Sequence, residues 1–302
     1  MMKQTVVEEI WRRHKEWSAT AGVLKSSIVL WRTVVLFLSI GGAFFATFAS
    51  QISAGFIQQL IAWAGAALLA MIPIITPRQL SATRTRTWTR ARSASEGMKT
   101  ELYMYLSHAA PYDGSSTDSL EILRKRTQEI EQSVLDLAKY LAKTKTKHSP
   151  PPKELNANDY LQLRVAHQID WYLKNAGLYA DKSSRFRNAE LILAVTAALL
   201  AASAGIWEDT LVVGGSSIAI GAWVAVLTTI GGTLTAHIAA SRFDHLVTIY
   251  TATAFQLRNL VMQWPPKGGG TVPSPQWSEF VRNCEDAISK ENESWMAKWT
   301  KQ

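Results

Sequence analysis

Two long stretches without charged side chains constrain this sequence more than any other feature. Residues 33–77 contain no Asp, Glu, Lys or Arg, and residues 191–241 contain only the adjacent pair Glu208 and Asp209. A helix that crosses a bilayer needs about 20 mostly apolar residues, so each stretch can hold two spans and a turn. Buried helices of soluble proteins rarely extend so far without a charge. We therefore predict four spans, at about residues 33–49, 56–76, 191–206 and 212–236.

The basic residues indicate how these spans are oriented. All 32 Lys and Arg residues fall in residues 1–32, 78–187 and 242–302, and the two short loops between paired spans contain none. Positive residues accumulate on the cytoplasmic side of a membrane, and an even number of spans returns the chain to the side where it began. The sequence therefore predicts a multi-pass protein whose N- and C-termini are both cytoplasmic.

The net charge of +8 is interpreted in the same way. Basic residues close to a span are attracted to anionic lipid headgroups, so we expect a membrane surface as the partner of these charges and no nucleic acid. The predicted headgroup-binding residues follow the second span directly: Arg78, Arg84, Arg86, Arg90 and Arg92. The lone cysteine, Cys284, cannot form an intrachain disulfide and is interpreted as a small packed residue.

The order of segments repeats along the chain. Each half contains an amphipathic helix, an apolar hairpin, a long helix that we expect to continue from the second span of the hairpin, a linker and a terminal helix. Such a repeat indicates a duplicated module, and it predicts two domains, residues 1–148 and 149–302. The predicted fold is an all-α integral membrane protein with two tandem helical hairpins, whose long helices extend into a cytoplasmic helical bundle.

Short motifs in both halves resemble those of a known family. The second half contains Asp159-Tyr-Leu-Gln-Leu-Arg164, Trp171-Tyr-Leu-Lys174, Phe280-Val-Arg-Asn-Cys-Glu285 and Glu291-Asn-Glu-Ser-Trp295. The first half contains Trp88-Thr-Arg90-Ala-Arg92 and Ala109-Ala-Pro-Tyr112. Together with the hairpins, these motifs resemble the bacterial SLATT family, the two-transmembrane effector domains associated with nucleotide-signalling conflict systems, in two tandem copies.

The resemblance is incomplete at two places. The second half lacks a Trp-x-x-x-Arg run after its hairpin, and the first half lacks the terminal Glu-Asn-x-x-Trp. The resemblance implies a protein of the bacterial cytoplasmic (inner) membrane. It also implies a role in defence, either by assembly into a pore or by signalling across the membrane.

Small and polar residues within the spans are compatible with a pore. Small residues let spanning helices approach closely, and we predict such packing at Gly41, Gly42, Ala46, Gly215, Ala219, Gly221 and Ala225. The predicted pore-lining residues are Thr229, Thr233, His237, Gln58 and Gln59. Ordinary helix packing remains the alternative for the hydroxyl groups, which can bond to their own backbone, and simple anchoring at the interface remains the alternative for His237.

The acidic pair Glu208 and Asp209 has two interpretations. Repeated around an oligomer, the two carboxylates would form a ring at the outer mouth of a pore that favours cations. Alternatively, they only keep a short loop hydrated. No charged residue is predicted in the middle of a span, which argues against a proton relay or a charged transport site.

The predicted function is an oligomeric membrane protein that forms a channel or pore, cation-preferring if it conducts, as a membrane-disrupting effector in bacterial defence. The alternative is a non-conducting, membrane-anchored scaffold whose cytoplasmic bundle recruits partner proteins. The expected partners are the lipid bilayer, anionic lipid headgroups, further copies of the chain and ions. The sequence shows no metal-ligand spacing, nucleophile elbow or phosphate loop, so we expect no enzyme, no metal and no cofactor.

Overall fold

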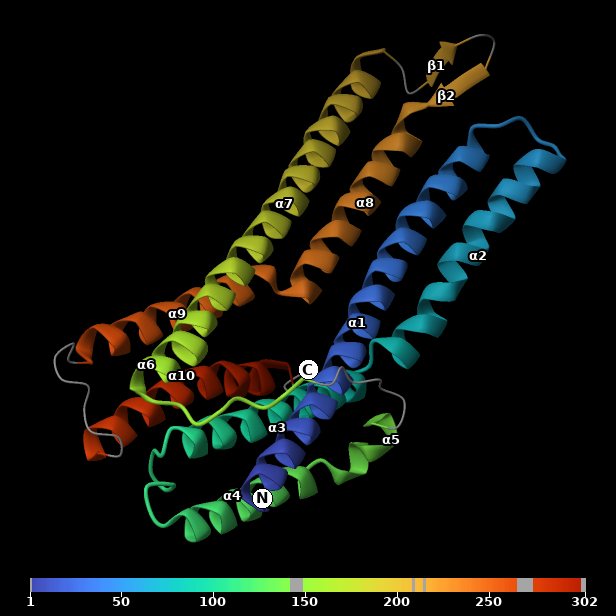
Figure 1. Ribbon diagram of the computed structural model, residues 1–302. Helices are drawn as coiled ribbons and strands as arrows, with labels where there is room; N and C mark the ends of the chain where they lie inside the picture. The colour runs from blue at the N-terminus through green and yellow to red at the C-terminus, as the bar shows by residue number, and fades with distance from the viewer. Residues whose placement is uncertain (1, 142–148, 208–209, 214–215, 265–273, 300–302) are drawn as a thin grey trace. The chain divides into compact units, whose positions relative to one another are not determined.

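The computed structural model describes residues 2–141, 149–207, 210–213, 216–264 and 274–299 (Figure 1). These residues are almost entirely helical, which confirms the all-α class. The chain forms two compact units. The membrane unit comprises Ser27–Ser81 and Leu178–Leu246, and the polar unit comprises Met1–Ser26, Ala82–Gly177 and Val247–Gln302. Both sequence halves contribute to each unit, and the predicted domain division between residues 148 and 149 stays a prediction.

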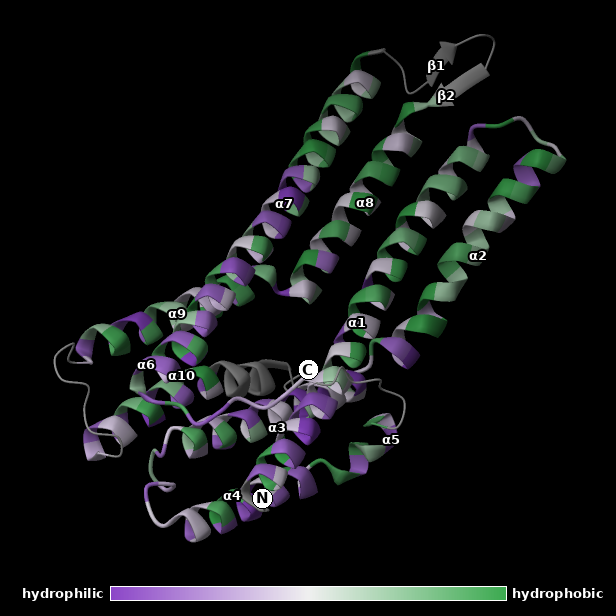
Figure 2. Ribbon diagram, viewed as in Figure 1, coloured by the Kyte–Doolittle hydropathy of each residue, from purple (hydrophilic) through white to green (hydrophobic). Residues whose placement is uncertain are grey.

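The membrane unit contains the predicted spans. They belong to α1 (Met2–Ser50), α2 (Phe56–Gln79), α7 (His167–Trp207) and α8 (Ile220–Ser241), which supply four stretches long and apolar enough to cross a membrane. A helix that is apolar on most sides is typical of a membrane span, and Figure 2 shows α2 and α8 mostly in the green of hydrophobic residues. The chain is therefore a membrane protein.

The fourth span begins later than the predicted residue 212. The strands β1 (Thr210–Val213) and β2 (Ser216–Ala219) pair antiparallel, with Val213 opposite Ser216, and α8 starts only at Ile220. Thr and Val favour extended structure because their β-branched side chains suit a pleated strand. The remaining 22 residues of α8 are still long enough for the hydrocarbon core of a bilayer.

The helices after the second and fourth spans do not continue from them, contrary to our expectation, whereas α1 and α7 are long helices that extend well beyond the first and third spans. α2 ends at Gln79 before α3 (Ala82–Leu106), and α8 ends at Ser241 before α9 (Phe243–Gln263). Arg242, which lies between α8 and α9, has a left-handed conformation with φ of 51°. A left-handed residue stops a helix by turning its backbone away from the axis. Both halves break at the equivalent point, which fits the repeated layout.

The polar unit is built around α3, which packs against α4 (Ser116–Gln132) and α10 (Pro275–Trp299). The hydroxyl of Ser115 accepts a hydrogen bond from the amide of Asp118 at 3.2 Å and caps α4, as is common for serine before a helix. Short segments complete the unit: η1 (Leu135–Leu137), α5 (Ala138–Leu141), α6 (Ala157–Asp159) and the π-helical η2 (Tyr160–Ala166). Its core includes the fully buried side chains of Trp17, Leu102, Leu123, Trp277 and Ile288.

Candidate functional site

The exposed face of α8 carries only small side chains. Its exposed residues at three- and four-residue spacing are Gly221, Ala225, Thr228 and Gly232, and this spacing places them along one side of a helix. The span α2 exposes large side chains instead, such as Phe56 at 79% and Trp63 at 75%. Large apolar side chains suit lipid, whereas small ones allow a second helix to come close.

The threonines of α8 bond to their own helix. The hydroxyl of Thr229 donates to the carbonyl of Ala225 at 2.8 Å, and that of Thr233 donates to the carbonyl of Thr229 at 2.8 Å. Thr229 is exposed and Thr233 is half-buried. Because these hydroxyl protons are satisfied within the helix, both residues can lie in an apolar environment, and their oxygens remain available as acceptors.

A cavity of about 410 Å³ lies between α1 and α8 in the membrane unit. Two of the predicted pore-lining residues, Thr233 and His237, contribute to its wall, whereas Thr229, Gln58 and Gln59 do not. The imidazole of His237 also packs at 5.2 Å from the ring of Phe186. The lining residues are Arg32, Val35, Leu36, Ser39, Leu80, Gly232, Thr233, Ala236, His237 and Ala240.

The sequence pattern did not single out Arg32 for this site. Arg32 is the last charged residue before the first apolar stretch, and this position was the one signal that could have identified it. Its partner across the cavity, His237, comes from α8, and no periodicity connects two residues so far apart in the chain. The cavity is therefore a property of the folded chain alone.

The outer glutamines occupy different places. Gln58 is half-buried and Gln59 is exposed, both in the first turn of α2. A third glutamine, Gln51, accepts a hydrogen bond from the amide of Ala219 at 2.7 Å and so joins the turn after α1 to the start of α8. Gln51 was not predicted as a site residue. Glu208, Asp209 and Gly215 lie outside the described residues.

Glycines bring α1 and α2 into close contact. A Cβ atom on Gly42 would lie 2.6 Å from Cδ2 of Leu69, and one on Gly41 would lie 3.3 Å from Cδ1 of Leu68. On the opposite helix, a Cβ atom on Gly65 would lie 2.9 Å from the backbone nitrogen of Ala46. The predicted set Gly41, Gly42 and Ala46 thus faces α2, and Gly65 is the partner that the sequence pattern did not single out.

The five arginines predicted to bind headgroups differ in their surroundings. Arg78 lies in the last turn of α2, and the other four lie in α3. Arg90 is engaged within the polar unit, where it donates to both carboxylate oxygens of Asp136 at 2.8 Å and to the carbonyl of Ser133 at 2.6 Å. Arg84 and Arg92 also interact within the chain. Headgroup binding by these residues stays a prediction.

The polar unit contains a buried ion pair made from two of the second-half motifs. Arg164 on η2 and Glu285 on α10 have side chains that are only 2% and 1% exposed, and they join through two hydrogen bonds of 2.8 and 2.6 Å. The hydroxyls of Tyr160 and Thr100 donate to the same carboxylate at 3.0 and 2.9 Å. This carboxylate therefore ties together η2, α3 and α10.

Further charged and aromatic groups surround this pair. The guanidinium of Arg164 stacks 4.5 Å from the ring centroid of Tyr103, a favourable cation–π arrangement. Burial lowers the pKa of Lys99 to about 8, and the positive charge of Arg164 is the second cause of this shift. Burial also raises the pKa of the Cys284 thiol, whose side chain is fully buried. Cys284 is thus a packed residue with little thiolate character.

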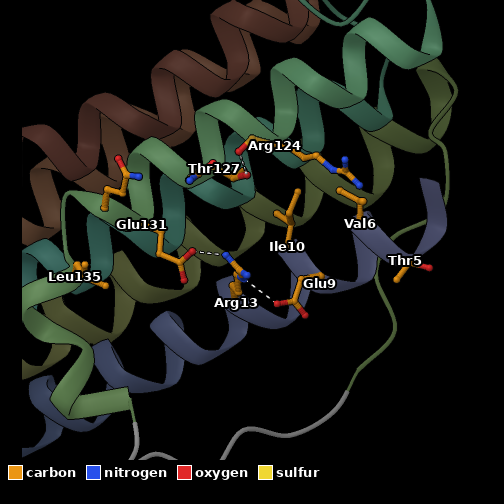
Figure 3. Close-up of a pocket in the computed structure, with 11 residues that line it drawn as sticks. Thr5, Val6, Glu9, Ile10, Arg13, Arg124, Thr127, Glu131 and Leu135 are labelled. Carbon is orange, nitrogen blue, oxygen red and sulfur yellow. Dashed lines mark hydrogen bonds and ion pairs between the residues drawn. The ribbon is translucent and has the colours of Figure 1, made fainter. Parts of the chain in front are cut away.

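A groove of about 550 Å³ lies between the N-terminal part of α1 and the C-terminal half of α4 in the polar unit. Figure 3 shows Arg13 reaching toward Glu131 on one side and Glu9 on the other. The Nε atom of Arg13 donates to Glu9 at 2.8 Å, while Val6 and Ile10 contribute apolar surface. The charged side chains in the groove are of both signs and pair with one another. The groove therefore has no net charge that would select an anion or a cation.

No group of three His, Cys, Asp or Glu residues among the described parts of the chain could hold a metal ion. The carboxylate of Glu285 already accepts four hydrogen bonds from its own chain, whereas the buried Nη1 atom of Arg164 has no partner among the described residues. These observations leave the small-residue face of α8 and the cavity beside it as the candidate functional site.

Comparison with known families gives two matches. Residues 160–295 match the model described as SMODS and SLOG-associating 2TM effector domain 1, which confirms the SLATT resemblance for the second half. Residues 15–119 match a family of proteins of unknown function, DUF4231. The two matches lie in the two predicted modules, as expected for tandem copies. Neither a curated protein nor a solved structure matches the chain significantly.

Proposed function

Because this chain belongs to the SLATT family through residues 160–295, we propose that it is a membrane effector whose copies associate through α8 to form a pore. The matched domain is by description a two-transmembrane effector domain, and the described part of the chain contains four stretches long and apolar enough to span a membrane. Conduction, self-association and the preference for cations are our proposals.

The small-residue face of α8 is the observation that carries this proposal. In a bilayer, an exposed face needs cover from lipid or from another helix, and the exposed residues of α2 suit lipid. Gly221, Ala225 and Gly232 on α8 instead suit a helix, because small side chains permit close backbone contact. Four spans in one chain make a small bundle, so a conduit requires further copies.

The same geometry supports the choice of lining residues. Thr229 lies beside the exposed face of α8, and Thr233 and His237 line the adjoining cavity, so association through this helix would bring polar groups near the axis of an oligomer. Glu208 and Asp209 would stand at its outer mouth and favour cations. We also propose that both termini lie in the cytoplasm of a bacterium and that the protein lies in its inner membrane, because the two short loops between paired spans contain no Lys or Arg.

Cross-linking and conductance together test the proposal. We expect the purified protein in lipid vesicles to yield cross-linked oligomers and to conduct in planar bilayers. Ala225→Leu should abolish both signals, since a large side chain separates the helices. The matched control is Leu60→Ala on the exposed face of α2, which should preserve both. A monomer in lipid, or equal effects of the two substitutions, would refute association through α8.

A non-conducting scaffold is the second candidate, favoured by the groove between α1 and α4. That groove combines the apolar Val6 and Ile10 with Glu9, Arg13 and Glu131, a mixture common at sites that bind protein segments. In this case the hairpins only anchor the polar unit. A monomeric, non-conducting protein that still needs an intact groove for its cellular effect would favour this alternative.

A further inference from the structure

We propose that the cavity between α1 and α8 binds the phosphate of an anionic lipid headgroup. The proposal concerns this cavity alone, and it holds whether or not the protein conducts. It rests on four observations of the membrane unit: the guanidinium and the imidazole in the wall, the lack of acidic residues among the described lining residues, the position of the cavity along the spans and the nature of its remaining walls.

The polar side chains in the wall suit a phosphate. Arg32 and His237 both line the cavity, and Arg242 follows α8 directly, where its amide donates to the carbonyl of Ile238 at 3.0 Å. None of the ten described lining residues is Asp or Glu. A guanidinium presents paired N–H donors that match two phosphate oxygens, so Arg32 is the principal anchor and His237 the second donor.

Two described carboxylates of the membrane unit are engaged with other groups. Glu190 accepts a hydrogen bond from Thr235, which does not line the cavity. Asp244 accepts a hydrogen bond from Ser183 at 2.8 Å and forms an ion pair with Arg187. An anion that enters the cavity therefore meets the positive guanidinium of Arg32 and no negative charge among the described wall residues.

The position of the cavity indicates that the anion belongs to a lipid. Arg32 immediately precedes the uncharged stretch 33–77, so its guanidinium lies at the boundary between hydrocarbon and headgroups, where long basic side chains reach toward lipid phosphates. A free anion from water would have to enter beside apolar surface. A lipid already has its phosphate at this depth.

The remaining walls suit the part of a lipid next to its phosphate. Val35, Leu36 and Leu80 are aliphatic, and Gly232, Ala236 and Ala240 are small. The hydroxyls of Ser39 and Thr233 donate to carbonyls of their own helices, at 3.0 and 2.8 Å. The volume of about 410 Å³ is in the range of sites for small ligands, enough for a phosphate with its glycerol.

The test measures binding of phosphatidylglycerol to the full chain in phosphatidylcholine nanodiscs, with bound lipid counted by native mass spectrometry. We expect Arg32→Gln to weaken binding about tenfold or more, as for loss of a charge-assisted hydrogen bond, and His237→Gln to weaken it severalfold. Arg185→Gln is the matched control, because Arg185 is an exposed residue of α7 outside the cavity, and it should change binding less than twofold.

A second pair of variants tests the cavity without changing charge. Ala240→Leu should fill the cavity and weaken binding about tenfold, whereas Ala202→Leu, at an exposed position of α7, should have no effect. Inorganic phosphate at millimolar concentration should not displace the lipid. Displacement by inorganic phosphate would assign the site to free phosphate and overturn the lipid proposal. Equal losses in each variant and its control would overturn the site itself.

Discussion

The buried pair Arg164–Glu285 makes a strong prediction about stability. Glu285→Gln removes the negative charge but keeps the size of the side chain, and it leaves the buried guanidinium of Arg164 without its hydrogen-bonded counter-ion. Removing one partner of a buried ion pair typically costs about 3–5 kcal/mol. We expect the loss in the free energy of unfolding to fall within this range, because the carboxylate also accepts hydrogen bonds from Tyr160 and Thr100 and the pair is almost inaccessible to water.

Thermal unfolding followed by tryptophan fluorescence would measure this loss. The ring of the buried Trp277 lies 5.6 Å from that of Tyr160, so its emission reports on this region. At about 2–4 °C per kcal/mol for a chain of this size, Glu285→Gln should lower the Tm by about 10 °C. As a control, Glu16→Gln breaks an exposed pair with Arg12 and should change stability by less than about 1 kcal/mol.

A double variant separates the charge effect from general damage to the core. Arg164→Met combined with Glu285→Met removes both charges and should be more stable than Glu285→Gln, since apolar residues often replace a buried ion pair at little cost. If Glu285→Gln unfolds within about 2 °C of the wild-type protein, the carboxylate does not hold the three segments together. A double variant less stable than the single one would equally refute this reasoning.

Three further predictions concern other parts of the chain. Gly65→Ala should destabilise the first hairpin by about 1–3 kcal/mol, because its Cβ would lie 2.9 Å from the backbone of Ala46; Gly231→Ala, which meets nothing within 4 Å, should cause no loss in the same unfolding assay, and equal losses would contradict the close contact. Burial lowers the pKa of Lys99 in the folded state from 10.5 to about 8, so between these pH values the unfolded chain binds more protons and the free energy of unfolding rises with pH. Denaturation at pH 7.5 and 9.5 should show this rise in the wild-type protein and a smaller one in Lys99→Met, and identical slopes would disprove it. Arg242 has a φ of 51°, a conformation that favours glycine, so Arg242→Gly should be more stable than Arg242→Ala by about 1 kcal/mol; equal melting temperatures would show that this strain is absent.

The four apolar spans were predictable from the sequence alone. A bilayer has no water to satisfy the backbone, so a span must be a continuous apolar helix, and such a stretch is a local property visible in residues 33–77 and 191–241. Repetition of the same segments in both halves and the motifs ending at Arg164 and Glu285 were equally readable. These local features were sufficient to indicate the family.

The contacts between segments could be decided only by the tertiary structure. Arg164 and Glu285 both appeared in the motifs, but nothing in their spacing indicated that they form one buried pair with Thr100. Nothing in the sequence around Gly65 indicated that it packs against the first span. Arg32 and His237 line the same cavity only because α1 and α8 pack together. Local patterns specify helices, whereas the partner of each side chain depends on how distant segments pack, and no single helix carries that information.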